Sequence, residues 1–377
     1  MQRYKEAALS AGRILQEYEL CEQCLGRLFS KRLRLRSNRL LGRRLLGGKP
    51  AGRCHICRGL FGDLGHYAQL MTDAASGYEF ESFMVGCMVR PSVIDRDDQV
   101  RSRYRLRGAD GIKTDITKEL GRIFSRRTRA RADPLRPDLT VILNMRDRSC
   151  SVHSRSVIVS GRYVKVQRGV TQKQKSCEDC AGSGCAKCDW HGLSGYESVE
   201  GQISEFLFGR LGGSVARFTW VGGEDKSSLV LGSGRPFFAR IQNPRRRKIR
   251  LRSKVLDSVR LGCMGMVSRP PRGPLRFVST VQMSVPATGD LKKLKKLAGA
   301  TVAVYEKSGR RSEKKIHSIR YKRKKDTLEV MMRADGGLPI KRFVSGDEVS
   351  PSISQVLGAP CTCLEFDFVD VSMITIN

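Results

Sequence analysis

Three stretches of the chain repeat their apolar residues with the period of a helix. Between Ala7 and Leu20 the apolar residues recur three or four positions apart, and the segments KTDITKELGRIFSRR (113–127) and VEGQISEFLFGRL (199–211) show a similar spacing. Apolar positions at this spacing lie on one face of a helix. The pattern therefore predicts helices in all three stretches, the first of them leading into a cysteine motif.

Other segments are typical of short β-strands separated by polar turns. DLTVILNM (138–145), SVIVSG (156–161) and RYVKVQRG (162–169) are rich in β-branched residues, as are FTWV (218–221) and LVLGSGRPFFARI (229–241). The glycine-rich segment GGEDKSS interrupts the last two runs, which places Glu224 and Asp225 at a loop tip between strands. The pattern as a whole predicts an α+β fold.

The length of 377 residues predicts more than one domain. Changes in composition divide the chain into a cysteine-knuckle region (1–61), an α/β unit (62–172), a glycine-rich second knuckle (173–193) and a C-terminal domain (194–377). No internal repeat of fixed period is present.

The charge of the chain indicates a polyanionic partner. Lysine and arginine number 70 against 37 acidic residues, a formal net charge of +33. A membrane surface is the alternative, but no run of about 18 apolar residues occurs. The N-terminal segment lacks the apolar region of a secretory signal, so we expect a cytoplasmic protein.

Eight of the 13 cysteines form paired motifs. In a reducing compartment, C-x2-C pairs favour zinc over disulfides, and a site of four thiolates is structural because it leaves no open position. Buried thiols without metal are the alternative, and Asp189 or His191 could replace a ligand of the second set. The predicted ligands are Cys21, Cys24, Cys54 and Cys57 in one site and Cys177, Cys180, Cys185 and Cys188 in the other.

Basic residues gather in several segments spread over the sequence. Such a distribution favours a structured RNA, which is recognised through shape and backbone, over a short DNA site read base by base. A solvated surface helix is the alternative for the first segment, where no acidic residue lies between Glu22 and Asp63. The candidate RNA-binding residues are Arg32, Arg34, Arg36, Arg127, Arg162, Arg168, Arg245, Arg246 and Arg247.

The order of several motifs resembles one family over nearly the whole chain. These motifs are ELCEQCLGRLFS, CHIC, PDLTVIL with GRYVKVQRGVTQ, the knuckle CEDCAGSGCAKCDWHG with YESVE, GGEDKSSLVLGSGRPFFARIQNPRR, and GGLPIKRFVSGD with PSISQVLG. In this order they resemble the archaeal tRNA pseudouridine synthases that modify uridines 54 and 55 of the T loop, a family also present in eukaryotes.

The resemblance implies a THUMP-type RNA-binding domain and a C-terminal pseudouridine synthase domain with a mixed, mainly antiparallel sheet. It implies an enzyme that isomerises tRNA uridine without an organic cofactor, and we expect a monomer. By residue type alone, Asp225 could simply cap its turn or pair with Arg235. Carried over from the family, Asp225 is catalytic as nucleophile or base, and Lys341 is its ion-pair partner. The candidate substrate-binding residues are Arg235, Ile340 and Phe277.

The chain departs from the family pattern around this loop. Gly223 stands where the family has an arginine, Ser227 and Leu229 replace an aspartate and another arginine, and Pro339 replaces a tyrosine. The segment RFVSTVQMSV contains no tyrosine, so Phe277 is the nearest aromatic residue. These changes keep a second hypothesis open, a catalytically weak or inactive tRNA-binding or folding factor.

Overall fold

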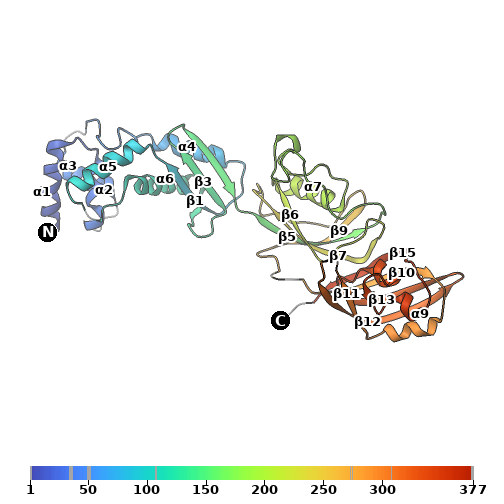
Figure 1. The fold of residues 1–377 in the computed structure, drawn as a ribbon. Helices are drawn as coiled ribbons and strands as arrows, with labels where there is room; N and C mark the ends of the chain where they lie inside the picture. Colours follow the sequence, from blue (N-terminus) through green and yellow to red (C-terminus); the bar gives the residue numbers. More distant parts are fainter. Residues whose placement is uncertain are drawn as a thin grey trace. The chain divides into compact units, whose positions relative to one another are not determined.

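The chain forms two compact units that divide between Arg155 and Ser156 (Figure 1). The computed structural model describes residues 2–33, 37–48, 52–106, 108–271, 273, 275–306 and 308–374. Within these residues no helix is both long enough and apolar enough to cross a membrane.

The first unit begins with three helices, α1 (Gln2–Glu17), α2 (Glu22–Leu33) and α3 (Asn38–Leu46). The helix predicted before the first cysteine motif is therefore present. Two glycines let α2 and α3 approach backbone to backbone. A Cβ atom on Gly26 would lie 1.7 Å from the carbonyl oxygen of Asn38, and one on Gly42 would lie 1.7 Å from that of Glu22. Any larger residue would force the helices apart.

The rest of the first unit is a four-stranded sheet with three helices. The strand order is β2-β1-β3-β4, with β1 parallel to both neighbours and β3 antiparallel to β4. The predicted helix at 113–127 is α6, and the predicted strand at 138–145 is β3. The elements are α4 (Leu64–Ala75), β1 (Ser82–Met88), α5 (Pro91–Arg103), α6 (Ile112–Thr128), β2 (Arg131–Ala132), β3 (Leu139–Asn144) and β4 (Ser149–Ser154).

The second unit is built on one mixed, mainly antiparallel sheet. The strand order is β14-β11-β12-β13-β10-β15-β7-β5-β9-β8, with β6 beside β7. Among the described strands of this sheet, only β15 and β7 pair in parallel. The strands are β5 (Val157–Lys165), β6 (Ala216–Trp220), β7 (Val230–Ile241), β8 (Lys254–Val255), β9 (Val259–Val267), β10 (Phe277–Pro286), β11 (Thr301–Tyr305), β12 (Arg311–Lys324), β13 (Thr327–Asp335), β14 (Val349–Ser350) and β15 (Glu365–Met373).

Short helices complete the second unit. The predicted helix at 199–211 is α7 (Val199–Leu211), which begins at the N-cap Ser198 and ends at Gly212 in the left-handed region. Its residues Ile203 and Leu207 are fully buried in the same core as Phe237 of β7. The other helical segments are η1 (Ala186–Cys188), η2 (Leu291–Leu297), α8 (Ile340–Ser345) and α9 (Ile353–Leu357).

Residues 157–165 differ from the sequence-based grouping. The pattern placed this strand in one unit with 138–145, whereas β5 lies between β7 and β9 in the second unit's sheet. Alternation shows that a segment is a strand but does not identify its partners, and those partners lie more than 60 residues further along. The four-part domain division itself stays a prediction.

Candidate active site and metal centres

The loop from Val221 to Leu229 joins β6 to β7 and holds two neighbouring carboxylates in different surroundings. The side chain of Glu224 is fully buried, whereas that of Asp225 is 34% exposed. Glu224 therefore faces the interior of the unit, and Asp225 is accessible from solvent.

Asp225 forms an ion pair with Lys341, as the family pattern predicts. Lys341 Nζ donates to Asp225 Oδ2 at 2.9 Å from the second position of α8. Asp225 Oδ1 accepts from the amide N–H of Ser227 at 2.9 Å and from its hydroxyl at 2.7 Å. The hydrogen bonds from Lys341 and Ser227 hold the pKa of Asp225 well below its usual range. The carboxylate is therefore ionised at neutral pH.

The predicted substrate-binding residues Phe277 and Ile340 lie near this pair in different settings. A Cβ atom on Gly222 would come within 2.4 Å of the Phe277 ring, and one on Gly336 within 2.3 Å. The half-buried ring is thus packed between the loop and the segment that leads to α8. Ile340, at the first position of α8, is 6% exposed and packs into the core.

Arg235 lies in the interior, where no phosphate can reach its side chain. Its guanidinium is fully buried, donates to Glu224 Oε2 at 3.3 Å and to the carbonyl of Val221 at 2.9 Å, and lies over the ring of Phe368. The sequence placed Arg235 among the candidate substrate-binding residues and left a pairing with Asp225 open. The structure places Arg235 in contact with the loop, and Glu224 rather than Asp225 is its partner.

Lys165 and Tyr163 also contact the loop, and sequence reasoning did not single them out. Tyr163 donates its hydroxyl to Glu224 Oε2 at 2.8 Å, and Lys165 Nζ lies 3.4 Å from Glu224 Oε1. Burial lowers the pKa of Lys165, and the Glu224 carboxylate opposes this effect. A signal for Lys165 exists in the sequence, because Val157, Val159, Tyr163 and Lys165 occupy alternate positions and all face the core.

Arg162 and Arg168, both predicted to bind RNA, are occupied by contacts within the unit. Arg162 donates to the carbonyl oxygens of Ser233, Gly234 and Val371. Arg168 makes a bidentate pair with Asp367 at 2.7 and 2.8 Å and donates to the carbonyl of Ser227. These guanidinium groups join strands and loop in the second unit.

The remaining RNA-binding candidates are mostly exposed. Arg127, Arg245 and Arg246 are exposed, and Arg247 is half-buried. Arg127 donates to Gln69 and to the carbonyl of Gly65. Residues 34 and 36 and the side chain of Arg32 lie outside the described residues.

The neighbouring arginines of the first basic segment do have a carboxylate partner. Arg39 and Arg43, one turn apart on α3, both pair with Glu22 at 3.0 and 2.9 Å. Although no acidic residue is near them in the sequence, these arginines have a counter-charge in the folded unit, because α3 packs against the start of α2, where Glu22 lies.

A separate hollow of about 990 Å³ lies between α7 and residues 248–257. Phe206, Ile249 and Leu256 form its apolar part. Its cations outnumber its two carboxylates, Glu205 and Asp257, and are Arg210, Lys248, Arg250, Arg252 and Lys254. Neither Asp225 nor Lys341 lines this hollow, so it is separate from the candidate active site.

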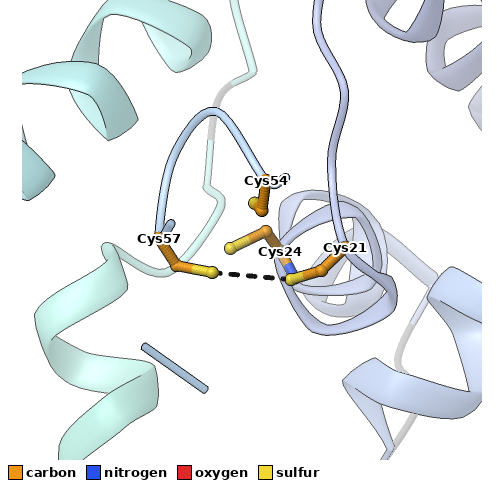
Figure 2. Close-up of side chains that lie close together, drawn as sticks. All are labelled: Cys21, Cys24, Cys54 and Cys57. Atoms are coloured by element: carbon orange, nitrogen blue, oxygen red, sulfur yellow. Dashed lines mark hydrogen bonds between the residues drawn. The ribbon is translucent and has the colours of Figure 1, made fainter. Parts of the chain in front are cut away.

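The first cysteine set converges on one point within the first unit (Figure 2). Cys21 and Cys24 lie at the start of α2, while Cys54 and Cys57 lie on the loop before α4. Their four sulfur atoms are all within 4.8 Å of one another, and Cys21 Sγ is 3.7 Å from Cys57 Sγ. Three of the four residues are buried.

The second set converges in the same way around η1. Cys177 Sγ lies 4.0 Å from Cys185 Sγ, and Cys188 Sγ lies 3.8 Å from both Cys180 Sγ and Cys185 Sγ. Gly182 and Gly184 have positive φ angles of 84° and 94°, which permit the reversal between the two pairs. His191 is not part of this cluster. Its ring stacks on Phe208, and its Nδ1 contacts the Tyr196 hydroxyl.

The geometry of both sets fits a tetrahedral metal ion. Four thiolates at a zinc–sulfur distance of about 2.3 Å place their sulfur atoms about 3.8 Å apart, close to the separations found here. A disulfide would need about 2.0 Å, and all the cysteines are free thiols. Two cysteine tetrads that could hold metal are therefore present, and four sulfur ligands are the donors zinc prefers.

Comparison with known proteins identifies relatives over the full length of the chain. Residues 67–144 match the family model described as Pus10 THUMP domain, archaeal, and residues 158–260 match the model described as Pus10, C-terminal. A protein of Nitrosopumilus maritimus is 50% identical over 99% of this chain and 100% of its own length. Proteins of Cenarchaeum symbiosum (40% identical; 94% and 90% covered) and Methanothermobacter marburgensis (31%; 95% and 96%) are similar too. All three carry the name tRNA pseudouridine synthase Pus10.

Proposed function

The chain belongs to the Pus10 family of tRNA pseudouridine synthases, and on this premise we propose that it acts on uridine 54, uridine 55 or both in the T loop of tRNA. The family membership agrees with the resemblance seen in the sequence and makes the chain an RNA uridine isomerase. The observation that supports an active site here is the ion pair of Asp225 with Lys341, whose side chains are 34% and 54% exposed.

The reaction places a simple demand on the protein. The bond between uracil N1 and ribose C1′ breaks, a bond between C5 and C1′ forms, N1 gains a proton and C5 loses one. No electrons are exchanged with another molecule, so no redox cofactor is required. Whether Asp225 attacks the sugar or removes a ribose proton, it must be unprotonated. Lys341 and Ser227 keep it so.

The substrate uridine has to leave its stack to reach a carboxylate on the protein surface. Phe277, half-buried between Gly222 and Gly336, is our candidate for stacking on the extruded uracil, which an aromatic face supports without a hydroxyl group. Ile340 anchors α8 in the core and thereby fixes the position of the neighbouring Lys341. Arg235 acts in this proposal through Glu224 and not on RNA.

We assign the grip on the tRNA backbone to exposed cations in both units. Arg127 is exposed in the first unit, and Arg245 and Arg246 are exposed in the second, which also has the cations around the hollow beside α7. Contacts of this kind are electrostatic and independent of sequence. Arg32, Arg34 and Arg36 stay predictions, as do a monomeric state and a cytoplasmic location.

We also propose that the two tetrads each hold a structural zinc ion. Cys21, Cys24, Cys54 and Cys57 would join α2 to the loop before α4, and the second tetrad would close the turn around η1. Four thiolate ligands leave no position for water. The metal would therefore stabilise the fold and take no part in the isomerisation.

A tritium-release assay tests the function. A tRNA transcript carrying tritium at C5 of uracil loses the label when the C5 proton leaves. We expect release by the wild type and none by Asp225→Asn, which keeps the shape of the side chain but not its charge, while both bind tRNA equally. Asp290→Asn, which alters another turn-capping aspartate of the same unit, should release tritium like the wild type. Label release by Asp225→Asn would contradict the assignment.

Transcripts in which uridine 54 or uridine 55 is replaced by cytidine locate the modified position, because tritium release is lost when the uridine that the enzyme modifies has been replaced.

The second candidate, a tRNA-binding factor of little activity, is favoured by Gly223 and Pro339 at positions where the family has arginine and tyrosine. It predicts tight tRNA binding by the wild type without tritium release under single-turnover conditions.

A further inference from the structure

One short segment of the chain holds three successive carbonyl groups of the loop that carries Asp225. Lys165 Nζ donates to the carbonyl of Asp225 at 3.0 Å. The amide N–H of Gly169 donates to the carbonyl of Lys226 at 2.8 Å. Arg168 donates to the carbonyl of Ser227. The backbone from 225 to 227 is thus fixed by residues 165–169, about 60 positions earlier in the chain.

Lys165 is an unusual residue at its position. Its side chain has no exposed surface, and the other inward residues of β5 include the apolar Val157 and Val159. A buried ammonium group is costly unless hydrogen-bond acceptors and a counter-charge surround it. Here the acceptors are the carbonyls of Val170 and Asp225, each at 3.0 Å, and the counter-charge is Glu224.

The other contacts around Glu224 do not require Lys165. Arg235 and Tyr163 both donate to Glu224 Oε2, so this carboxylate keeps a cation and a hydroxyl when Lys165 is neutral. The contacts that depend on Lys165 are the ion pair with Glu224 Oε1 and the hydrogen bonds to the carbonyls of Val170, Asp225 and Lys226. The lysine therefore holds the backbone of the loop in addition to balancing the charge of Glu224.

We propose that Lys165 is a positioning residue, which with the support of Arg168 fixes the backbone of the 225–227 loop so that the Asp225 carboxylate stays beside Lys341. This inference rests on the proposed catalytic role of Asp225. Ser227 and Lys341 orient the carboxylate from its outer side, and Lys165 holds the main chain of the same residue from the inner side. Both are needed, because a carboxylate displaced by about 1 Å can lose about a hundredfold in rate.

The test compares Lys165→Met with the wild type, since methionine fills the same volume without charge. We expect the single-turnover rate of tritium release to fall about 10- to 100-fold, with tRNA affinity unchanged within about threefold. Arg101→Met is the matched control. Arg101 also donates to a main-chain carbonyl, that of Ala109, but in the first unit, and its loss should leave the rate unchanged.

Hydrogen exchange provides a readout that does not depend on activity. In Lys165→Met, the amides of Ser227, Ser228 and Leu229 should exchange faster, because their acceptors lie on Asp225 and Asp367 around the released loop. The rest of the unit should keep its protection. If Lys165→Met does not fold, Arg168→Met carries the test, since Arg168 is 35% exposed. It should slow release about 3- to 10-fold with the same local increase in exchange.

The outcomes separate this inference from the proposed function. Tritium release by Asp225→Asn overturns the role of Asp225, and the positioning role falls with it. An inactive Asp225→Asn beside a fully active Lys165→Met overturns only the positioning role. A Lys165→Met variant that folds but loses tRNA affinity together with the rate shows a general structural role and also overturns it.

Discussion

At the residue scale, two adjacent carboxylates in one loop have different surroundings and different partners. Glu224 is buried among Lys165, Arg235 and Tyr163, whereas Asp225 meets Lys341 at the surface. A buried carboxylate with two cations around it is a structural anchor. A partly exposed one with a single lysine keeps an open side toward a substrate. The distinction between the two lies in burial and not in residue type.

The Lys341 ion pair makes a prediction about pH. The pKa of Asp225 is lowered by Lys341 and Ser227, so the carboxylate stays ionised until the pH falls well below the ordinary aspartate value of about 3.9. Its contribution to stability is complete above that ordinary value and is lost as the pH falls from there to the lowered pKa of the folded protein. In Lys341→Met the pKa rises toward that value. We expect single-turnover tritium release to lose activity at a higher pH on the acid side than in the wild type.

Lys341→Arg keeps the charge and should keep the acid limit low. Because Lys341 is 54% exposed, either substitution should change the free energy of unfolding by no more than about 1 kcal/mol. Identical acid limits in the wild type and in Lys341→Met would refute control of Asp225 ionisation by this lysine.

At the scale of elements, the conformation of the 221–229 loop depends on where β6, β10 and α8 meet it. Gly222 has a positive φ of 79°, and its Cα lies against the ring of Phe277. An L-residue would be strained there and would also displace the ring. Gly223, one residue later, has open space around it, since an added Cβ atom would find its nearest neighbour, Gln172 Oε1, at 3.9 Å.

The two neighbouring glycines therefore form a matched pair for mutation. We expect Gly222→Ala to lower the free energy of unfolding by about 1–3 kcal/mol and to reduce tritium release, because Phe277 and the loop must move. Gly223→Ala should change stability by less than about 0.5 kcal/mol and leave release intact. Urea unfolding and the release assay measure both effects, and equal behaviour of the two variants would contradict the loop geometry.

At the scale of the whole molecule, the positive charge serves two purposes. The net charge of +33 attracts a polyanion, yet several arginines chosen from the sequence as RNA contacts hold the protein together. Arg162 and Arg168 bind carbonyls and carboxylates of the second unit. Arg39 and Arg43, which belong to the first basic segment but were not among those candidates, bind Glu22 in the same way. A count of basic residues therefore overestimates the number available to RNA.

The cysteine tetrads predict the metal content of the whole chain. We expect two zinc ions per chain by elemental analysis after purification under reducing conditions without chelator. Cys24→Ser and Cys180→Ser should each lose one ion, and Cys263→Ser, which alters an exposed cysteine outside both sets, should lose none. Removal of the metal should lower the melting temperature, because the ligands come from separate segments that the ion joins. A metal-free wild type would remove both assignments.

Some features could be predicted from local sequence. The helices around 113–127 and 199–211 and the strands on both sides of the Asp225 loop follow from periodicity, and both cysteine sets follow from spacing. Family resemblance supplied the pairing of Asp225 with Lys341, which composition alone would not have revealed. Asp225 alone could have been a turn cap, and it does also cap its turn through Ser227.

What the sequence determined by itself is therefore local: which residues face a core, which cysteines sit close enough to share a metal, and that the molecule attracts polyanions. The tertiary structure decided which cations are held by contacts within the protein and which are exposed, and it placed Lys165 against the backbone of Asp225. The physical reason is that periodicity and spacing describe neighbours along the chain. The partners of Lys165, Arg168 and Arg235 are set by strand order, which brings Arg168 to Asp367 although the two residues are 199 positions apart.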